Sequence, residues 1–198
     1  MLVGTLFNGD AVVAQKVSPT CPPDTQPNNQ TTFDIRFDNP NLPPWTRFDV
    51  RPISGTVISS PLPDPKVVLF SSEADRFSVP LVLPGLSIST KDVLFGFEVR
   101  NQTNTTYPGV QFCGAVYDQS GNIVFVSSGE VLERTSTGGV APATLAPQQL
   151  TSIFGIARNV PVGPVQIRGW LWFGSKTDPT SAFAFVSTGL VTIQTISP

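Results

Sequence analysis

Apolar side chains recur at every second position through much of this chain, which is the period of a half-buried β-strand. In TTFDIRFDNPN, Phe33, Ile35 and Phe37 point one way and the polar residues between them point the other. The same alternation marks residues 93–99 and 165–173. Nothing sustains a helical period over three turns. The sequence therefore predicts an all-β protein.

Glycine and proline residues punctuate these stretches at the spacing expected of many short strands. Asn8-Gly9, between 2–7 and 11–15, is a strong signal for a tight hairpin. We expect strands at 2–7, 11–15, 33–38, 45–51, 55–59, 67–71, 77–83, 93–99, 110–117, 123–127, 131–134, 150–158, 165–173, 182–186 and 190–196. Pro147–Phe154 offers room for one helical turn.

An antiparallel β-sandwich of jelly-roll or immunoglobulin-like type fits this pattern. A length of 198 residues suits one large sandwich over 1–198. The alternative is two sandwiches, 1–85 and 91–198, because FDIRFDNPN (33–41) and FGFEVRNQT (95–103) are faintly alike. The sequence leaves both organisations open.

The segment VQFCGAVYDQSGNIVFVS (110–127) predicts a hairpin with apolar side chains on both faces. Phe112 and Val116 share one face, whereas Cys113 and Ala115 share the other. A half-buried strand needs only one apolar face, so something must cover the second. We expect another sheet, domain or subunit to do so.

Two later segments, VQIRGWLWFG and SAFAFVS, repeat this feature. The candidates for an interface or a ligand platform are Arg168, Trp170, Trp172, Phe183 and Phe185. An Arg-x-Trp-x-Trp row on a flat sheet would stack sugar rings or hold a cation. Coverage by protein is the interpretation that we favour, since three two-faced strands exceed what one simple sandwich covers.

The composition of the chain excludes several kinds of catalytic and metal-binding site. The chain has no histidine, so it has neither a Ser-His-Asp nor a Cys-His arrangement, nor a histidine metal site. Asp34 and Asp38 flank Arg36 on one strand face, as on a solvated surface, and do not face each other across a cleft as in a glycosidase. Residues 118–122 lack the ligand pattern of a calcium loop and predict an Asp-capped turn. We expect no enzyme activity, no catalytic residue, no cofactor and no metal.

Charge and hydropathy limit the partners. The net charge is −2 with 13% charged residues, which argues against nucleic acid. No apolar run reaches the length of a membrane span, and the N-terminus lacks a basic region typical of a secretory signal. Asn29, Asn101 and Asn104 begin glycosylation sequons. Cys21 and Cys113 either form a disulfide or remain two buried thiols.

The stretches FEVRNQTNTTYPGVQFCGAVYDQSGNIV and LAPQQLTSIFGI resemble the FxLYD-type domain of bacterial and archaeal surface proteins. Tyr117 and Asp118 match its signature pair, while Val116 stands where that family prefers leucine. The resemblance covers residues 92–173. It implies a surface β-sandwich without catalytic residues.

Together these observations predict a non-enzymatic structural subunit that assembles with copies of itself or with other subunits. A virion shell or a surface filament would suit it, and its location would be the virion or the cell exterior. Apolar sheet faces and the terminal strands Leu2–Phe7 and Leu190–Ile196 would make the contacts. The alternative is a secreted carbohydrate-binding or adhesion module, in which Trp170 and Trp172 hold a glycan and the two cysteines are bridged.

Overall fold

The computed structural model describes residues 2–18, 33, 35–53, 67–163, 165–173 and 184–197, without the side chains of 172–173 and 184–185. The described residues form strands and connections and no helix, so the all-β prediction is confirmed. The helical turn expected within Pro147–Phe154 is absent from them. The chain divides into two compact units, Met1–Pro61 and Leu62–Pro198. Whether it forms one sandwich or two remains a prediction.

The first unit contains β1 (Leu2–Asn8), β2 (Ala11–Ser18) and β3 (Arg47–Pro52). The second contains β4 (Val67–Phe77), β5 (Leu81–Leu83), β6 (Leu86–Ile88), β7 (Val93–Asn101), β8 (Tyr107–Pro108), β9 (Gln111–Tyr117), β10 (Ile123–Glu130), β11 (Leu132–Arg134), β12 (Val140–Pro142), β13 (Thr144–Leu145), β14 (Leu150–Ala157), β15 (Gln166–Phe173) and β16 (Ala184–Ile196). The strand expected at 55–59 lies outside the described residues.

The first unit is an antiparallel sheet with β1 between β2 and β3. The predicted hairpin forms, with Asn8 paired to Ala11 and the turn at Gly9-Asp10; Gly9 has a φ of 59°, a conformation that glycine adopts without strain. The backbone amide of Thr46 donates to the carbonyl of Phe7 at 2.7 Å and ties the start of β3 to β1.

The strand expected at 33–38 is wrong for the residues that the structure describes there. Ile35 and Phe37 are half-buried and Arg36 and Asp38 exposed, so the alternation of faces is real. The Ile35 side chain, however, lies over Gly4, where an added Cβ would meet it at 2.8 Å. The segment thus crosses a face of the sheet, where backbone groups have no strand edge to pair with.

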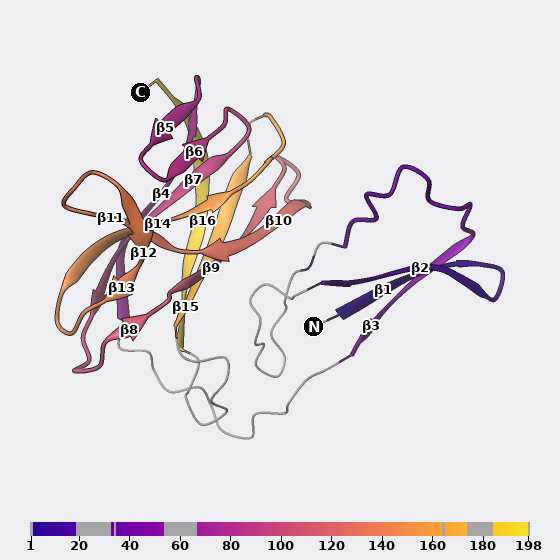
Figure 1. Ribbon diagram of the computed structural model, residues 1–198, viewed down its shortest axis with the longest axis horizontal. Helices are drawn as coiled ribbons and strands as arrows, with labels where there is room; N and C mark the ends of the chain where they lie inside the picture. Colours follow the sequence, from indigo (N-terminus) through magenta and orange to yellow (C-terminus); the bar gives the residue numbers. More distant parts are fainter. Residues whose placement is uncertain are drawn as a thin grey trace. The chain divides into compact units, whose positions relative to one another are not determined.

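The second unit is built on a nine-stranded sheet in the order β10-β9-β15-β16-β4-β7-β14-β11-β12 (Figure 1). The two strands expected at 182–186 and 190–196 are one continuous strand, β16. It lies between β15 and β4 and pairs with β4 in parallel, whereas the other pairs are antiparallel. The sequence analysis expected a purely antiparallel sheet, and the parallel pair of β16 with β4 shows that this expectation is wrong.

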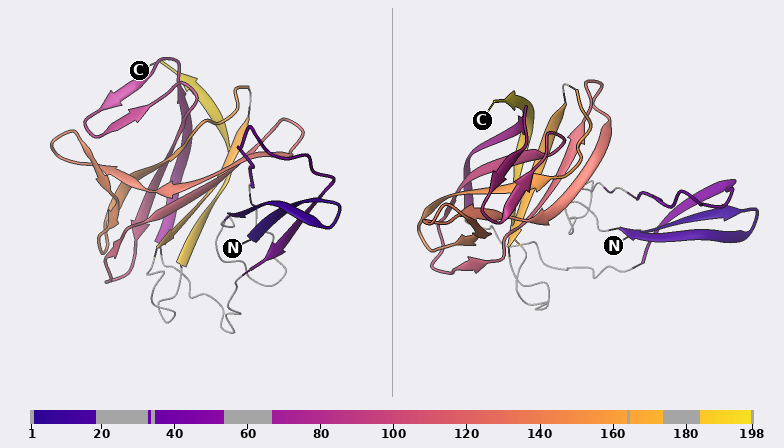
Figure 2. Two further views of the ribbon diagram at one scale, coloured as in Figure 1. Left: turned by 45° about the vertical axis from the view of Figure 1, so that its right-hand side comes forward. Right: turned by 45° about the horizontal axis from the view of Figure 1, so that its top comes forward.

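The sheet curls so that β7 and β14 face β9 and β15 across one apolar core (Figure 2). Phe95 and Phe112 are fully buried there and meet edge to face, with ring centroids 5.7 Å apart. Glycines make room for both rings. A Cβ at Gly169 would overlap the Phe95 ring, and one at Gly155 would lie 2.6 Å from Phe112.

A second apolar cluster covers the outer face of β4, β7 and β14. Phe77 on β4 packs there against Leu86 and Ile88 of the β5–β6 hairpin. Phe154 of β14 and Ile196 of β16 join the cluster. The hairpin and the end of β16 lie side by side in both figures (Figures 1 and 2). The chain therefore covers part of its own outer sheet face.

The fit between Gly169 and Phe95 predicts a sharp loss of stability on adding one methyl group. For Gly169→Ala we expect the free energy of unfolding to fall by about 1–3 kcal/mol, because overpacking a closed core forces side chains off their preferred rotamers. Denaturant unfolding followed by fluorescence measures this change. Gly129→Ala on β10 is the control, since a Cβ there has no neighbour within 4 Å. Equal losses in both variants would contradict this account of the core.

Candidate functional site

The second apolar faces that the sequence analysis assigned to assembly are covered by the chain itself where the structure describes them. Cys113 and Ala115 are fully buried, and Trp170 is 7% exposed, although none of the three belongs to the main core cluster. These residues therefore offer no free surface to a neighbour. Of the covers that the sequence analysis allowed (another sheet, domain or subunit), no further subunit is needed to bury these three side chains.

The predicted ligand platform is brought together only in part. Arg168 is exposed, and its guanidinium lies 5.5 Å from the centre of the Trp170 ring. Trp172 and Phe185 lie on β15 and β16, but their side chains are outside the described set, as is Phe183 altogether. Because Trp170 is buried, its ring presents no flat face on which a sugar could stack.

The terminal strands also occupy positions that the sequence analysis did not foresee. β1 is the middle strand of its sheet, and β16 lies inside the nine-stranded sheet. β1 pairs along its length with β2 on one side and β3 on the other, so it has no open edge for a strand of another molecule. β16 pairs with β15 through residues 184–192 and with β4 through residues 193–196.

Uncovered apolar side chains occur on both faces of the small sheet in the first unit, with Val17 opposite Val3 and Phe48 opposite Leu6. We call this set the N-terminal apolar surface; its members are Val12, Val17, Phe33, Trp45, Phe48 and Ile53, which are between 42% and 66% exposed. Within the described part of this unit, Leu6 is the one large apolar side chain that is buried. Alternation in the sequence did not reveal this surface, because alternation does not say whether a face has a cover.

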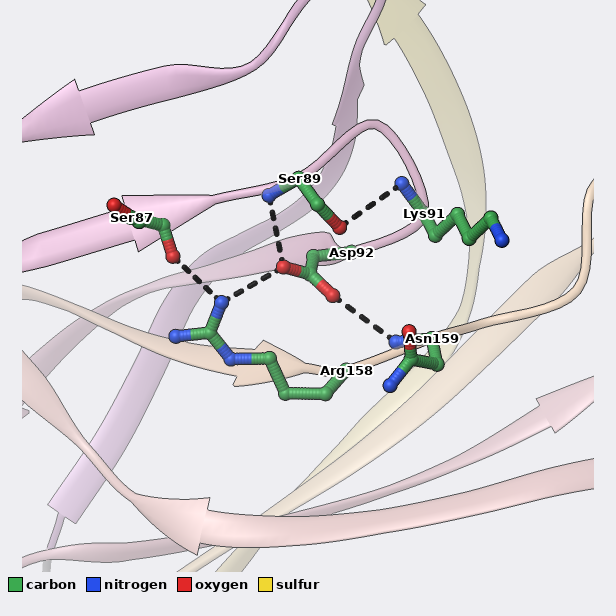
Figure 3. Close-up of polar contacts among 6 residues, drawn as sticks. All are labelled: Ser87, Ser89, Lys91, Asp92, Arg158 and Asn159. Carbon is green, nitrogen blue, oxygen red and sulfur yellow. Dashed lines mark hydrogen bonds and ion pairs between the residues drawn. The ribbon is translucent and has the colours of Figure 1, made fainter.

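The most ordered polar site is a cluster around Asp92, in the turn before β7 (Figure 3). Its Oδ2 accepts hydrogen bonds from the Ser89 amide at 2.9 Å and from Arg158 Nη1 at 2.7 Å, and its Oδ1 accepts one from the Asn159 amide at 3.0 Å. Arg158 Nη1 also donates to the Ser87 carbonyl at 2.6 Å. These bonds fasten the β6–β7 turn to the end of β14.

The electrostatics of Asp92 suit a structural role. Its side chain is 4% exposed, and burial alone would raise its pKa. Hydrogen bonds from the two backbone amides and from Arg158 outweigh burial, so the pKa of Asp92 lies below its ordinary value. A carboxylate held ionised by three hydrogen bonds from its own chain suits a structural role. Sequence reasoning missed this site, because its partners are far apart in the chain.

An open groove of about 380 Å³ runs over the outer face of β4, β7 and β14. Glu73, Glu98 and Arg134 line it, and Ser71 Oγ donates to Glu98 Oε2 at 3.3 Å. Burial, and then the nearby charge of Glu73, raise the pKa of Asp75 on the same strand. Across the described ranges, no cluster of three or more metal-ligating side chains occurs.

Two further sequence predictions have structural outcomes. Asp118 caps a turn, with Oδ1 accepting from the amides of Ser120 at 2.9 Å and Asn122 at 2.8 Å. The predicted Asp-capped turn is confirmed. Cys113 is disulfide-bonded. Cys21 lies outside the described residues, and the proposed pair stays a prediction.

Among the residues that the structure describes, no helix is long and apolar enough to cross a membrane. No protein-family model matches the chain, and no curated protein matches it. The FxLYD-type resemblance is thus neither supported nor contradicted. One similar solved structure is that of AvmM, described as catalysing macrocyclization in alchivemycin A biosynthesis. It shares 10% sequence identity over 66% of this chain and 90% of that chain, with a TM-score of 0.30.

The comparison with AvmM corrects one expectation. The sequence analysis predicted that the chain is not an enzyme, whereas the protein in that structure is one. We therefore withdraw the prediction. A TM-score of 0.30 carries no argument for a particular activity of this chain.

The Asp92 cluster predicts a pH-dependent contribution to stability. We expect Asp92→Asn to lower the free energy of unfolding by about 1–3 kcal/mol at pH 7, as for hydrogen bonds to a charged group. The pKa of Asp92 is lower in the folded chain than the ~3.9 of an unfolded one, so its contribution is complete above about pH 4. It disappears as the pH falls through the folded pKa.

Denaturant unfolding of both proteins between pH 2 and 7 measures this difference. Asp38→Asn is the matched control, because Asp38 forms an exposed ion pair with Lys16 at 3.1 Å and should change stability by less than about 1 kcal/mol. A difference between wild type and Asp92→Asn that grows at low pH would refute the assignment.

Proposed function

We propose that this chain is a structural subunit of a larger protein assembly, such as a virion shell or a surface filament. In this proposal the second unit is a stable β-scaffold and residues 2–61 form its contact module. The partners are copies of the same chain or other subunits of the assembly. Its place is the virion or the cell exterior.

The observation that carries the proposal is the contrast between the two units. In the second unit, clusters of buried side chains fill the curled sheet and cover part of its outer face. In the first, Leu6 is buried while the six members of the N-terminal apolar surface are not. A three-stranded sheet needs a covered apolar face to be stable. A protein partner is the simplest cover.

Burial of these apolar side chains would supply enough free energy for association. Full burial of a large apolar side chain stabilises by about 1.5–3 kcal/mol, so covering the exposed half of each member adds roughly 1 kcal/mol. The low share of charged residues, 13%, also suits a subunit whose outside is partly covered by neighbours.

As for the finer fold, we propose that the second unit is a β-sandwich of jelly-roll or immunoglobulin-like type. Support comes from the packing of β7 and β14 against β9 and β15, with Phe95 and Phe112 interleaved. A sandwich of this kind holds a core between two facing layers of strands.

The proposal predicts self-association of the purified chain. We expect light scattering and sedimentation velocity to show a mass that rises with concentration from micromolar to millimolar, and electron microscopy to show ordered particles or filaments at the highest values. The second unit alone, residues 62–198, should remain monomeric if the contact module lies in 2–61. A full-length chain that stays monomeric throughout this range would reject the proposal.

A further inference from the structure

We propose that β3 pairs with the β3 strand of a second copy, antiparallel and with Phe48 opposite its own counterpart. This inference rests on the proposed function, since it names the contact through which the first unit would self-associate. The pairing would join two three-stranded sheets into one six-stranded sheet related by a two-fold axis.

The described part of the first unit leaves the outer edge of β3 open. β3 pairs with β1 on one side, and no other described strand pairs with it on the other. Its register with β1 runs from Arg47 to Pro52 without a bulge. The opposite edge strand, β2, carries a register shift, and a bulge of this kind interrupts a regular pairing edge. β3 is thus the better edge for a partner strand.

Side chains on β3 divide cleanly between the two faces of the sheet. Arg47 and Asp49 lie opposite Phe7 and Thr5 of β1 and therefore share one face. Phe48 lies opposite Leu6 and belongs to the other face. A two-fold axis perpendicular to the sheet keeps each face continuous across the junction, so residues of one face meet residues of the same face.

The charges of β3 complement each other in the proposed register. With Phe48 on the axis, Arg47 of each copy lies opposite Asp49 of the other, which gives two opposite-charge pairs. Arg51 Nε donates to Asp49 Oδ2 within the chain, which leaves Oδ1 of that carboxylate as an acceptor. The Arg47 guanidinium lies 4.0 Å from the centre of the Phe7 ring, which holds it along the sheet surface.

Neighbouring registers are unfavourable for the same reason. A slide of two residues in one direction places Arg47 opposite Arg47, and in the other direction Asp49 opposite Asp49. Like charges directly opposite each other destabilise a strand pair. The charge pattern of β3 therefore selects one register from these three.

Apolar contact supplies a further part of the attraction. Phe48 is 66% exposed, and at the axis the two Phe48 rings would cover each other. Trp45 is 49% exposed and, just before β3, would approach Arg51 of the second copy. Aromatic and Arg side chains of this kind anchor many protein interfaces. A six-residue strand pair is small, so we expect one contact to be weak and repetition in an assembly to strengthen it.

Cysteine cross-linking tests the register in the full-length chain. On a two-fold axis, residues directly opposite have Cβ atoms about 4.5–5.5 Å apart, which is near the reach of a disulfide. We expect Phe48→Cys to form a covalent dimer under mild oxidation, seen on a non-reducing gel. Val82→Cys on β5, 74% exposed in the wild type, is the control, and neither this variant nor the wild type should give a covalent dimer on that gel.

Charge reversal gives an independent test by sedimentation. We expect Arg47→Asp to weaken self-association about tenfold, because it places like charges opposite each other twice. The double variant Arg47→Asp/Asp49→Arg should recover most of that loss, since the opposite-charge pairs are restored with their signs exchanged. Circular dichroism checks that the variants remain folded.

The outcomes separate this inference from the proposed function. If the wild type self-associates while Phe48→Cys fails to cross-link and Arg47→Asp associates normally, the β3 contact is wrong and the assembly proposal stands. If the wild type does not self-associate, the assembly proposal fails as well. An intramolecular cross-link from position 48 to a native cysteine would likewise overturn the β3 pairing.

Discussion

The contact between two phenylalanine rings and the glycines opposite them governs how the second unit closes. Phe95 on β7 and Phe112 on β9 come from strands that are four positions apart in the sheet order, yet their rings touch. They can do so because Gly155 and Gly169 leave the space that the rings fill. Each ring lies against the backbone of a strand on the opposite wall. Because each large ring fits against a glycine on the opposite wall, the two walls can approach each other, and the sheet curves around an enclosed core.

The two units differ in how much of their apolar surface is buried. In the second unit the β5–β6 hairpin covers part of the outer face of β4 and its neighbours. Asp92 and Arg158 also fasten the adjoining turn. The first unit crosses one face of its sheet with the segment around Ile35 and leaves Phe48 and other apolar residues at the surface. This difference is why the assembly proposal depends on the smaller unit and not on the larger one.

Local features were predictable from the sequence, and long-range ones were not. The buried positions of 93–99 and the Asn8-Gly9 hairpin depend on neighbours within a few residues, and both predictions are confirmed. The packing of Phe154 and Ile196 in the cluster around Phe77 depends on segments distant in the chain, which no periodicity encodes. The Asp92–Arg158 pair has the same character, with 66 positions between its members. Alternation at 35–38 indicated the faces correctly but not the backbone pairing, so it predicted a strand where the described residues form none.

The position of β16 has a consequence for how the chain is made. β16 follows every other strand of this unit in the sequence, yet it is an inner member of the sheet, and β15 and β4 have no shared neighbour until it has been made. Until then, both strands expose unpaired edges, which are the parts of a nascent sheet most prone to misassociation. Closure must wait for a contact of very high sequence separation, so this unit should complete its folding slowly and only after β16 has been synthesised. A chain without β16 would lose the strand that joins the two parts of the sheet.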